Sequence, residues 1–117
     1  MPYQRLLDRL VRSVAGAQGA LLLDATGEVV VEAGDGHERH RLIGAYQGIA
    51  LAKARALANR HSAGEISHVV CRYSDGSVIL QPLKDGYYLI LSLGREANVG
   101  QGLHRSADMR QRMNAEL

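Results

Sequence analysis

Aromatic residues are scarce in this chain of 117 residues, which contains no Phe, no Trp and five Tyr. A hydrophobic core therefore has to be built mainly from Leu, Ile, Val and Ala. Cysteine occurs once, as Cys71, which excludes an internal disulfide and fits a reducing compartment. No run of eighteen apolar residues occurs, so the sequence does not predict a membrane-spanning helix or direct insertion into a membrane.

Excess charge is also lacking. The formal net charge of +2 at pH 7 is too small by itself to indicate binding to nucleic acid or to an anionic membrane surface. The N-terminal residues MPYQRLLDR lack the apolar stretch of a signal peptide, so we expect a cytoplasmic protein. The length predicts one domain, spanning residues 1–117, with a single core.

Three segments have the hydrophobic spacing of helices. Residues 3–15 carry apolar side chains at i, i+3, i+4 and i+7, and charged side chains lie on the opposite side. A longer helix is predicted from about Glu38 to His61, and a more polar helix is predicted at the C-terminal end. Five β-rich runs lie between these helices: GALLLDA, ATGEVVVEA, EISHVVCRY, SVILQPL and YYLILSL.

The turns between these runs indicate an antiparallel sheet. Asp24 to Gly27 separates the first two runs, and Ser74-Asp75-Gly76 and Lys84-Asp85-Gly86 separate the last three. Apolar residues occupy consecutive positions within the strands, as in Leu21–Leu23 and Val78–Leu80, which indicates that both sheet faces are covered. The expected fold is therefore α+β, a five-stranded antiparallel sheet in a three-layer α/β/α sandwich.

Residue patterns for catalysis and for metal binding are weak. No P-loop pattern G-x-x-x-x-G-K-[ST] occurs. The candidate metal ligands are His37, His40, His61, His68 and Cys71, and they lack the two close ligand pairs that are typical of a zinc site. The aspartates of the turns adjoin glycines, where they stabilise the turn itself. We therefore predict a non-catalytic protein with no cofactor and no metal.

Arginine makes the first and last predicted helices basic. The residues concerned are Arg5, Arg9, Arg12, Arg105, Arg110 and Arg112. Neither helix belongs to a helix-turn-helix pattern or carries the aromatic side chains that stack on bases, so no nucleic-acid partner is predicted. A solvated basic face or an acidic protein partner explains these charges equally well.

The stretch LIGAYQGIALA, Leu42 to Ala52, contains no charged residue, although a helix of a small domain normally shows one polar face. Steps of 100° per residue divide this helix into two sides. The large side comprises Leu42, Ile43, Tyr46, Ile49, Ala50, Ala54 and Leu57, and we expect it to pack on the sheet. The small side comprises Gly44, Gly48, Leu51, Ala52, Arg55 and Asn59, and we expect it to face a second protein chain.

Three further segments carry a family resemblance through their order and spacing. They are Asp24-x-x-Gly27 after a buried strand, Pro82-Leu83-x-Asp85-Gly86-Tyr87-Tyr88-Leu89, and Glu96-Ala97-Asn98-x-Gly100. Together with the long alanine-rich helix, they resemble the Roadblock/dynein-light-chain family, and within it the bacterial MglB-type branch. The resemblance covers about residues 3–112 and implies the Roadblock/profilin-like version of the predicted sandwich.

The resemblance also implies a function. It implies a homodimer in which the third strands, Glu65–Tyr73, pair edge to edge and the helices Glu38–His61 lie side by side. The paired helices are then a platform for a Ras-like small GTPase. MglB-type proteins accelerate GTP hydrolysis by reordering the switch residues of the GTPase, without donating an arginine finger.

Carried onto this sequence, the resemblance implies two sets of residues. The GTPase-binding set is Gly44, Gly48, Leu51, Ala52 and Arg55, and the dimer-interface set is Gln47, Leu51, Val69 and Cys71. Arg39, Arg41 and Arg55 leave an arginine-finger variant open. Two alternatives are a non-catalytic scaffold for a motor, kinase or membrane-anchored complex, and a small-ligand sensor. The lack of aromatic or convergent polar residues at core positions argues against the sensor.

Overall fold

A computed structural model describes residues 2–34, 43, 44, 48, 50, 51, 53–56 and 66–117. Its elements are α1 (Pro2–Ser13), β1 (Ala17–Leu23), β2 (Val29–Gly34), β3 (Val69–Tyr73), β4 (Gly76–Pro82), the short 3₁₀ helix η1 (Lys84–Gly86), β5 (Tyr88–Gly94) and α3 (Val99–Glu116). Residues 43, 44, 48, 50, 51 and 53–56 are helical, and we call them the central segment. They confirm a helix between β2 and β3, and the rest of the predicted range Glu38–His61 lies outside the described residues.

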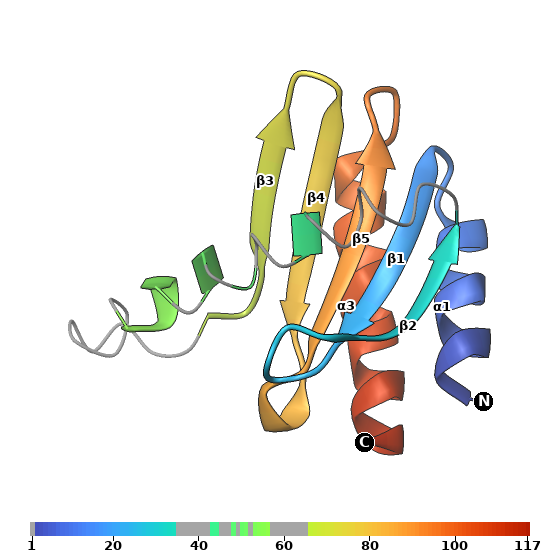
Figure 1. The fold of residues 1–117 in the computed structure, drawn as a ribbon. Coiled ribbons are helices and arrows are strands. Elements are labelled where there is room, and N and C mark those ends of the chain that lie inside the picture. Colours follow the sequence, from blue (N-terminus) through green and yellow to red (C-terminus); the bar gives the residue numbers. More distant parts are fainter. Residues whose placement is uncertain (1, 35–42, 45–47, 49, 52, 57–65) are drawn as a thin grey trace.

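The five strands form one antiparallel sheet in the order β2-β1-β5-β4-β3. β1 lies next to β5 because the chain crosses from β2 to β3, at the far edge, and then returns through two hairpins (Figure 1). The predicted five-stranded antiparallel sheet is thus confirmed, as is the order of its helices and strands.

Both faces of the sheet carry a hydrophobic core. On one face, Leu22, Leu89 and Leu91 pack with Leu7 and Leu10 of α1 and with methionines of α3. On the other face, Leu21, Leu23, Val78, Leu80, Tyr88 and Ile90 pack with Leu51 of the central segment. Neighbouring residues in a strand point to opposite faces, so the consecutive apolar residues of β1 serve two cores. The three-layer arrangement is visible in Figure 1, where α1 and α3 lie behind the sheet.

The hairpin between β1 and β2 is fixed by Asp24. Its Oδ1 accepts hydrogen bonds from Thr26 Oγ1 at 2.6 Å, from Thr26 N at 2.9 Å and from Glu28 N at 3.0 Å. These bonds, that of the Thr26 hydroxyl first and that of the Glu28 amide next, hold the pKa of the Asp24 carboxyl below its ordinary value of 3.8. Gly27 completes the turn with a φ of 89°, as the sequence predicts.

α3 lies close to the sheet because small residues line its inner side. A Cβ atom on Gly102 would come within 2.9 Å of Leu93 Cδ1 and 3.0 Å of Ile79 Cδ1. One turn later the fully buried Ser106 accepts a hydrogen bond from Gln81 Nε2 at 3.1 Å. The bond satisfies an amide that would otherwise be buried without a partner. None of the described helices combines the length and the apolar character that crossing a membrane requires.

Candidate functional site

The small side of the central segment lies against the sheet. Leu51 has no exposed surface and belongs to the cluster that contains Leu23 and Leu80. A Cβ atom on Gly44 would lie 3.1 Å from both Leu21 Cδ1 and Leu23 Cδ1. The predicted orientation is therefore wrong for these two residues, which were expected to face a second chain.

Gly48 and Arg55 point the same way. A Cβ atom on Gly48 would lie 3.9 Å from Tyr88 Cε2, and Arg55 Cζ lies 5.7 Å from the centroid of the Tyr88 ring, within the range of a cation–π contact. Tyr88 itself is buried among the apolar residues of this face. Gly48 and Arg55 thus lie on the side of the helix that faces the sheet, and not on its outward side.

The volume of the sheet side chains explains why Gly44 and Leu51 lie inward. Ile43, which belongs to the large side, packs against the same cluster, as predicted. The leucines of β1 and β4 and the ring of Tyr88 already fill this face, so a helix can approach closely only with its small residues inward. Lys53 and Ala56 are exposed and mark the outward side. Of the residues assigned to the two sides, Leu42, Tyr46, Ile49, Ala52, Leu57 and Asn59 lie outside the described residues, as does Gln47.

β3 is an edge strand that carries apolar side chains on both faces. It pairs with β4 in the register Val69↔Leu80, Val70↔Ile79 and Cys71↔Val78. Val69 packs against the core under the central segment, whereas Val70 packs against the core under α1 and α3. Cys71, on the same side as Val69, is half-buried. In the described sheet no strand lies beyond β3, so a second chain could add one there.

The opposite edge strand, β2, is covered differently. Gln4 of α1 donates a hydrogen bond from Nε2 to the Glu32 carbonyl oxygen at 2.8 Å, so a helix side chain occupies a backbone acceptor of this strand. The pairing of β1 with β2 is also interrupted between Leu22 and Leu23 by a register shift. Side-chain cover and irregular pairing both discourage the addition of another strand. The two edges therefore differ in their capacity for pairing.

Of the candidate metal ligands, His68 and Cys71 belong to the described residues. Within the part of the chain that the structure describes, no group of three His, Cys, Asp or Glu side chains is arranged to hold an ion. His68 precedes β3, and its Nδ1 lies 3.5 Å from Ser67 Oγ. His37, His40 and His61 lie outside the described residues, and so do Arg39 and Arg41.

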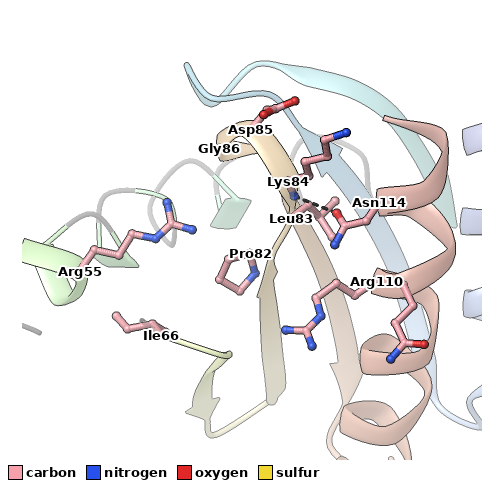
Figure 2. A pocket seen from close by; sticks show the side chains of 10 residues that line it. Arg55, Ile66, Pro82, Leu83, Lys84, Asp85, Gly86, Arg110 and Asn114 are labelled. Carbon is pink, nitrogen blue, oxygen red and sulfur yellow. Dashed lines mark hydrogen bonds between the residues drawn. The ribbon is translucent and has the colours of Figure 1, made fainter. Parts of the chain in front are cut away.

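A polar cleft that the sequence did not predict opens at the end of β4. It encloses about 590 Å³ and is lined by Arg55, Ile66, Pro82 and η1 on one side and by Arg110, Gln111 and Asn114 of α3 on the other. Figure 2 shows the Arg55 and Arg110 side chains extending toward Pro82 from opposite sides. The two arginines are far apart in sequence and belong to elements on opposite faces of the sheet, so no local pattern could have joined them.

The chain is similar in fold to known proteins. The family model of the Roadblock/LC7 domain matches residues 3–92. A Roadblock/LC7 domain from Streptomyces avermitilis superposes with a TM-score of 0.87 at 20% identity, over 97% of this chain and 95% of that one. MglB from Myxococcus xanthus gives 0.84 at 16% identity, over 96% and 91%. The gliding protein MglB from Thermus thermophilus gives 0.79 at 18% identity, over 97% and 88%. No curated protein sequence matches the chain significantly.

Proposed function

The chain belongs to the Roadblock/LC7 domain family, and on that premise we propose that it is a homodimeric regulator of a Ras-like small GTPase. In this proposal it stimulates GTP hydrolysis by reordering the switch residues of the GTPase, as the resemblance to the MglB-type branch implies. The observation that carries the proposal is the family match together with an edge strand, β3, that has apolar side chains on both faces and lies at the end of the sheet.

The dimer forms by antiparallel pairing of β3 with β3 of a second copy. Two antiparallel copies of one strand are related by a two-fold axis perpendicular to the sheet, and such an axis keeps the same face upward in both copies. The two central segments then lie on one face of a continuous sheet, while α1 and α3 of both copies lie on the other. Val69 and Cys71, which share the face of the central segment, lie beside the axis.

The GTPase binds on the outward side of the paired central segments. Because Gly44 and Leu51 pack on the sheet, the surface offered to a partner includes the exposed Lys53 and Ala56 instead. Gln47 and Ala52 lie outside the described residues and stay predicted contacts with the second subunit and the GTPase, respectively. The glycines contribute indirectly, since they let the helix sit close to the sheet.

Regulation of this kind needs no catalytic group from the regulator. A protein that binds one state of the GTPase switches more tightly than another shifts the equilibrium by the difference in binding free energy. The position of Arg55 supports this mechanism, since its guanidinium is held over the Tyr88 ring and does not lie on the outward side with Lys53. An arginine finger from Arg55 is therefore disfavoured.

Sedimentation velocity at micromolar concentration tests the dimer. We expect a species of twice the protomer mass of 12.7 kDa, and a monomer would refute the model. Cys71→Lys places an ammonium group beside the proposed axis and should weaken self-association about tenfold or more, because two like charges then meet at a desolvated edge. Val30→Lys is the matched control, since Val30 is exposed on β2, and it should leave the dimer intact.

Single-turnover GTP hydrolysis tests the regulator. A small GTPase that binds this protein is loaded with GTP, and hydrolysis is followed with and without the dimer. A faster rate supports the proposal, whereas binding with an unchanged rate would indicate the scaffold alternative. Lys53→Glu should weaken the complex about fivefold or more, and Arg9→Glu, an exposed change on α1, should alter it less than about twofold. Equal effects of the two changes would place the GTPase on another face.

A further inference from the structure

We propose that the cleft between Arg55 and Arg110 binds the phosphate group of a small organic molecule. The inference concerns a different surface from the GTPase platform and does not depend on it. It starts from the convergence of two guanidinium groups on Pro82 from opposite faces of the sheet (Figure 2).

The cationic groups of the cleft are only partly engaged. Arg110 donates one hydrogen bond, from an Nη to the Ser67 carbonyl oxygen at 3.4 Å. Arg55 contacts the face of the Tyr88 ring, a contact that leaves the N–H groups at the edge of its guanidinium plane available. Neither arginine forms a salt bridge with a carboxylate of the described residues. Most of the ten N–H donors that two guanidinium groups carry thus form no hydrogen bond with the described residues, and we assign them to a ligand.

Among the described residues, one carboxylate lines the cleft, and it lies away from the arginines. Asp85 sits in η1 with a left-handed backbone, at a φ of 60°, and Figure 2 shows it at the far end of the turn from Pro82. Lys84, the other charged residue of η1, donates from Nζ to the Leu117 carbonyl oxygen at 3.3 Å. The described side chains nearest to Pro82 are therefore cationic, which favours an anion as the ligand.

The space beside Pro82 is open because the pairing of β3 with β4 ends before it. β3 pairs with β4 only from Val69↔Leu80 to Tyr73↔Gly76, so Pro82 lies beyond the last paired residue. Proline also has no backbone N–H to offer a neighbouring strand. On the other wall, α3 holds η1 in place, because Asn114 Oδ1 accepts a hydrogen bond from Lys84 N at 2.8 Å. That bond orients the Asn114 amide so that its NH₂ group is left to donate to a ligand.

The arrangement favours phosphate over a single carboxylate. A guanidinium group presents a planar pair of N–H donors that matches two oxygens of a phosphate, and two such groups together balance a dianion. The cleft is much larger than an inorganic ion, and its volume of about 590 Å³ falls within the range of small-molecule sites. Ile66, Pro82 and Leu83 add apolar surface to the lining, which suits the organic part of a phosphate ester.

Titration of the full chain with phenyl phosphate, followed by amide NMR, tests the site. We expect saturable shifts of the signals of Leu83, Lys84 and the Asn114 side chain. Arg110→Gln and Arg55→Gln should each raise the Kd about tenfold, because each removes charge-assisted hydrogen bonds. Arg112→Gln is the matched control, since Arg112 is exposed on α3 outside the cleft, and its Kd should change less than about twofold.

Two parallel titrations identify the chemistry. Benzoate, which has the ring but a single charge, should bind at least about tenfold more weakly than phenyl phosphate. Inorganic phosphate should bind more weakly than its phenyl ester, because it does not contact the apolar wall. The proposal is overturned by an absence of saturable binding, by equal loss of affinity in Arg112→Gln, or by benzoate binding as tightly as the phosphate ester. Far-UV circular dichroism of each variant confirms that it is folded before its Kd is compared.

Discussion

Replacement of Leu51 distinguishes the observed orientation of the central segment from the one expected from its sequence. Leu51 is fully buried against Leu23 and Leu80, so Leu51→Ala removes the Cγ atom and both Cδ methyl groups from a packed core and leaves a cavity. Such changes cost about 2–5 kcal/mol. With an m-value of about 2 kcal/mol/M for urea, a loss of about 3 kcal/mol lowers the unfolding midpoint by roughly 1.5 M. An outward Leu51, covered only by a weakly bound partner, would cost little.

The assay is equilibrium unfolding in urea, followed by far-UV circular dichroism at one fixed protein concentration, because the stability of a dimer depends on concentration. Lys53→Ala is the control on the exposed side of the same helix, and its midpoint should correspond to a change of less than about 0.5 kcal/mol. If Leu51→Ala also stayed within about 0.5 kcal/mol at an unchanged m-value, the orientation described above would be incorrect.

Four further substitutions test individual positions. Gly48→Ala should stabilise the fold by about 0.5–1 kcal/mol in the same urea assay, since alanine favours the helix and its Cβ would meet only an ordinary contact at 3.9 Å. Gly44→Ala should gain less or lose stability, because its Cβ would meet two leucine methyl groups at 3.1 Å; an equal gain in both variants would contradict the close approach. Ser106→Ala should cost about 1–2 kcal/mol, because Gln81 Nε2 loses its buried partner, and thermal unfolding that matches the wild type would show that another acceptor replaces it. The ionised Asp24 carboxylate stabilises the fold above its ordinary pKa of 3.8, and this contribution is lost as the pH falls below 3.8 through the lower folded pKa. Unfolding free energy measured against pH should therefore fall less steeply below about pH 4 in Asp24→Asn than in the wild type, and identical slopes would disprove the linkage.

Local patterns were sufficient to predict the sheet. In β1, consecutive leucines predicted two covered faces, and Leu21 and Leu22 do serve different cores. The Asp24 turn was also predictable, because its hydrogen bonds are made within five residues. These features depend on residues that are close in sequence, so they can be predicted from a single sequence.

The orientation of the central segment depends instead on the residues that it meets. A helical projection separates large from small residues but carries no information on whether the facing sheet still has space. Here β1 and Tyr88 supply the bulk, so Gly44 and Leu51 of the small side lie inside, while Ile43 of the large side also packs against this core. The cleft was not predictable for a related reason, since Arg55 and Arg110 line it from elements on opposite faces of the sheet that are far apart in sequence.

The difference between the two sheet edges has a consequence for stoichiometry. If the proposed dimer forms through β3, a protomer that carries the Gln4 contact at β2 has one edge left for pairing, like a monofunctional monomer in polymer chemistry. Joining two such units consumes both reactive ends, so strand addition stops at the pair whatever the concentration. A bifunctional sheet would grow into a fibre by the same bonds. Under this proposal the Gln4 side chain helps to limit strand addition at β2, and its loss would matter more for the size of the assembly than for the fold of the protomer.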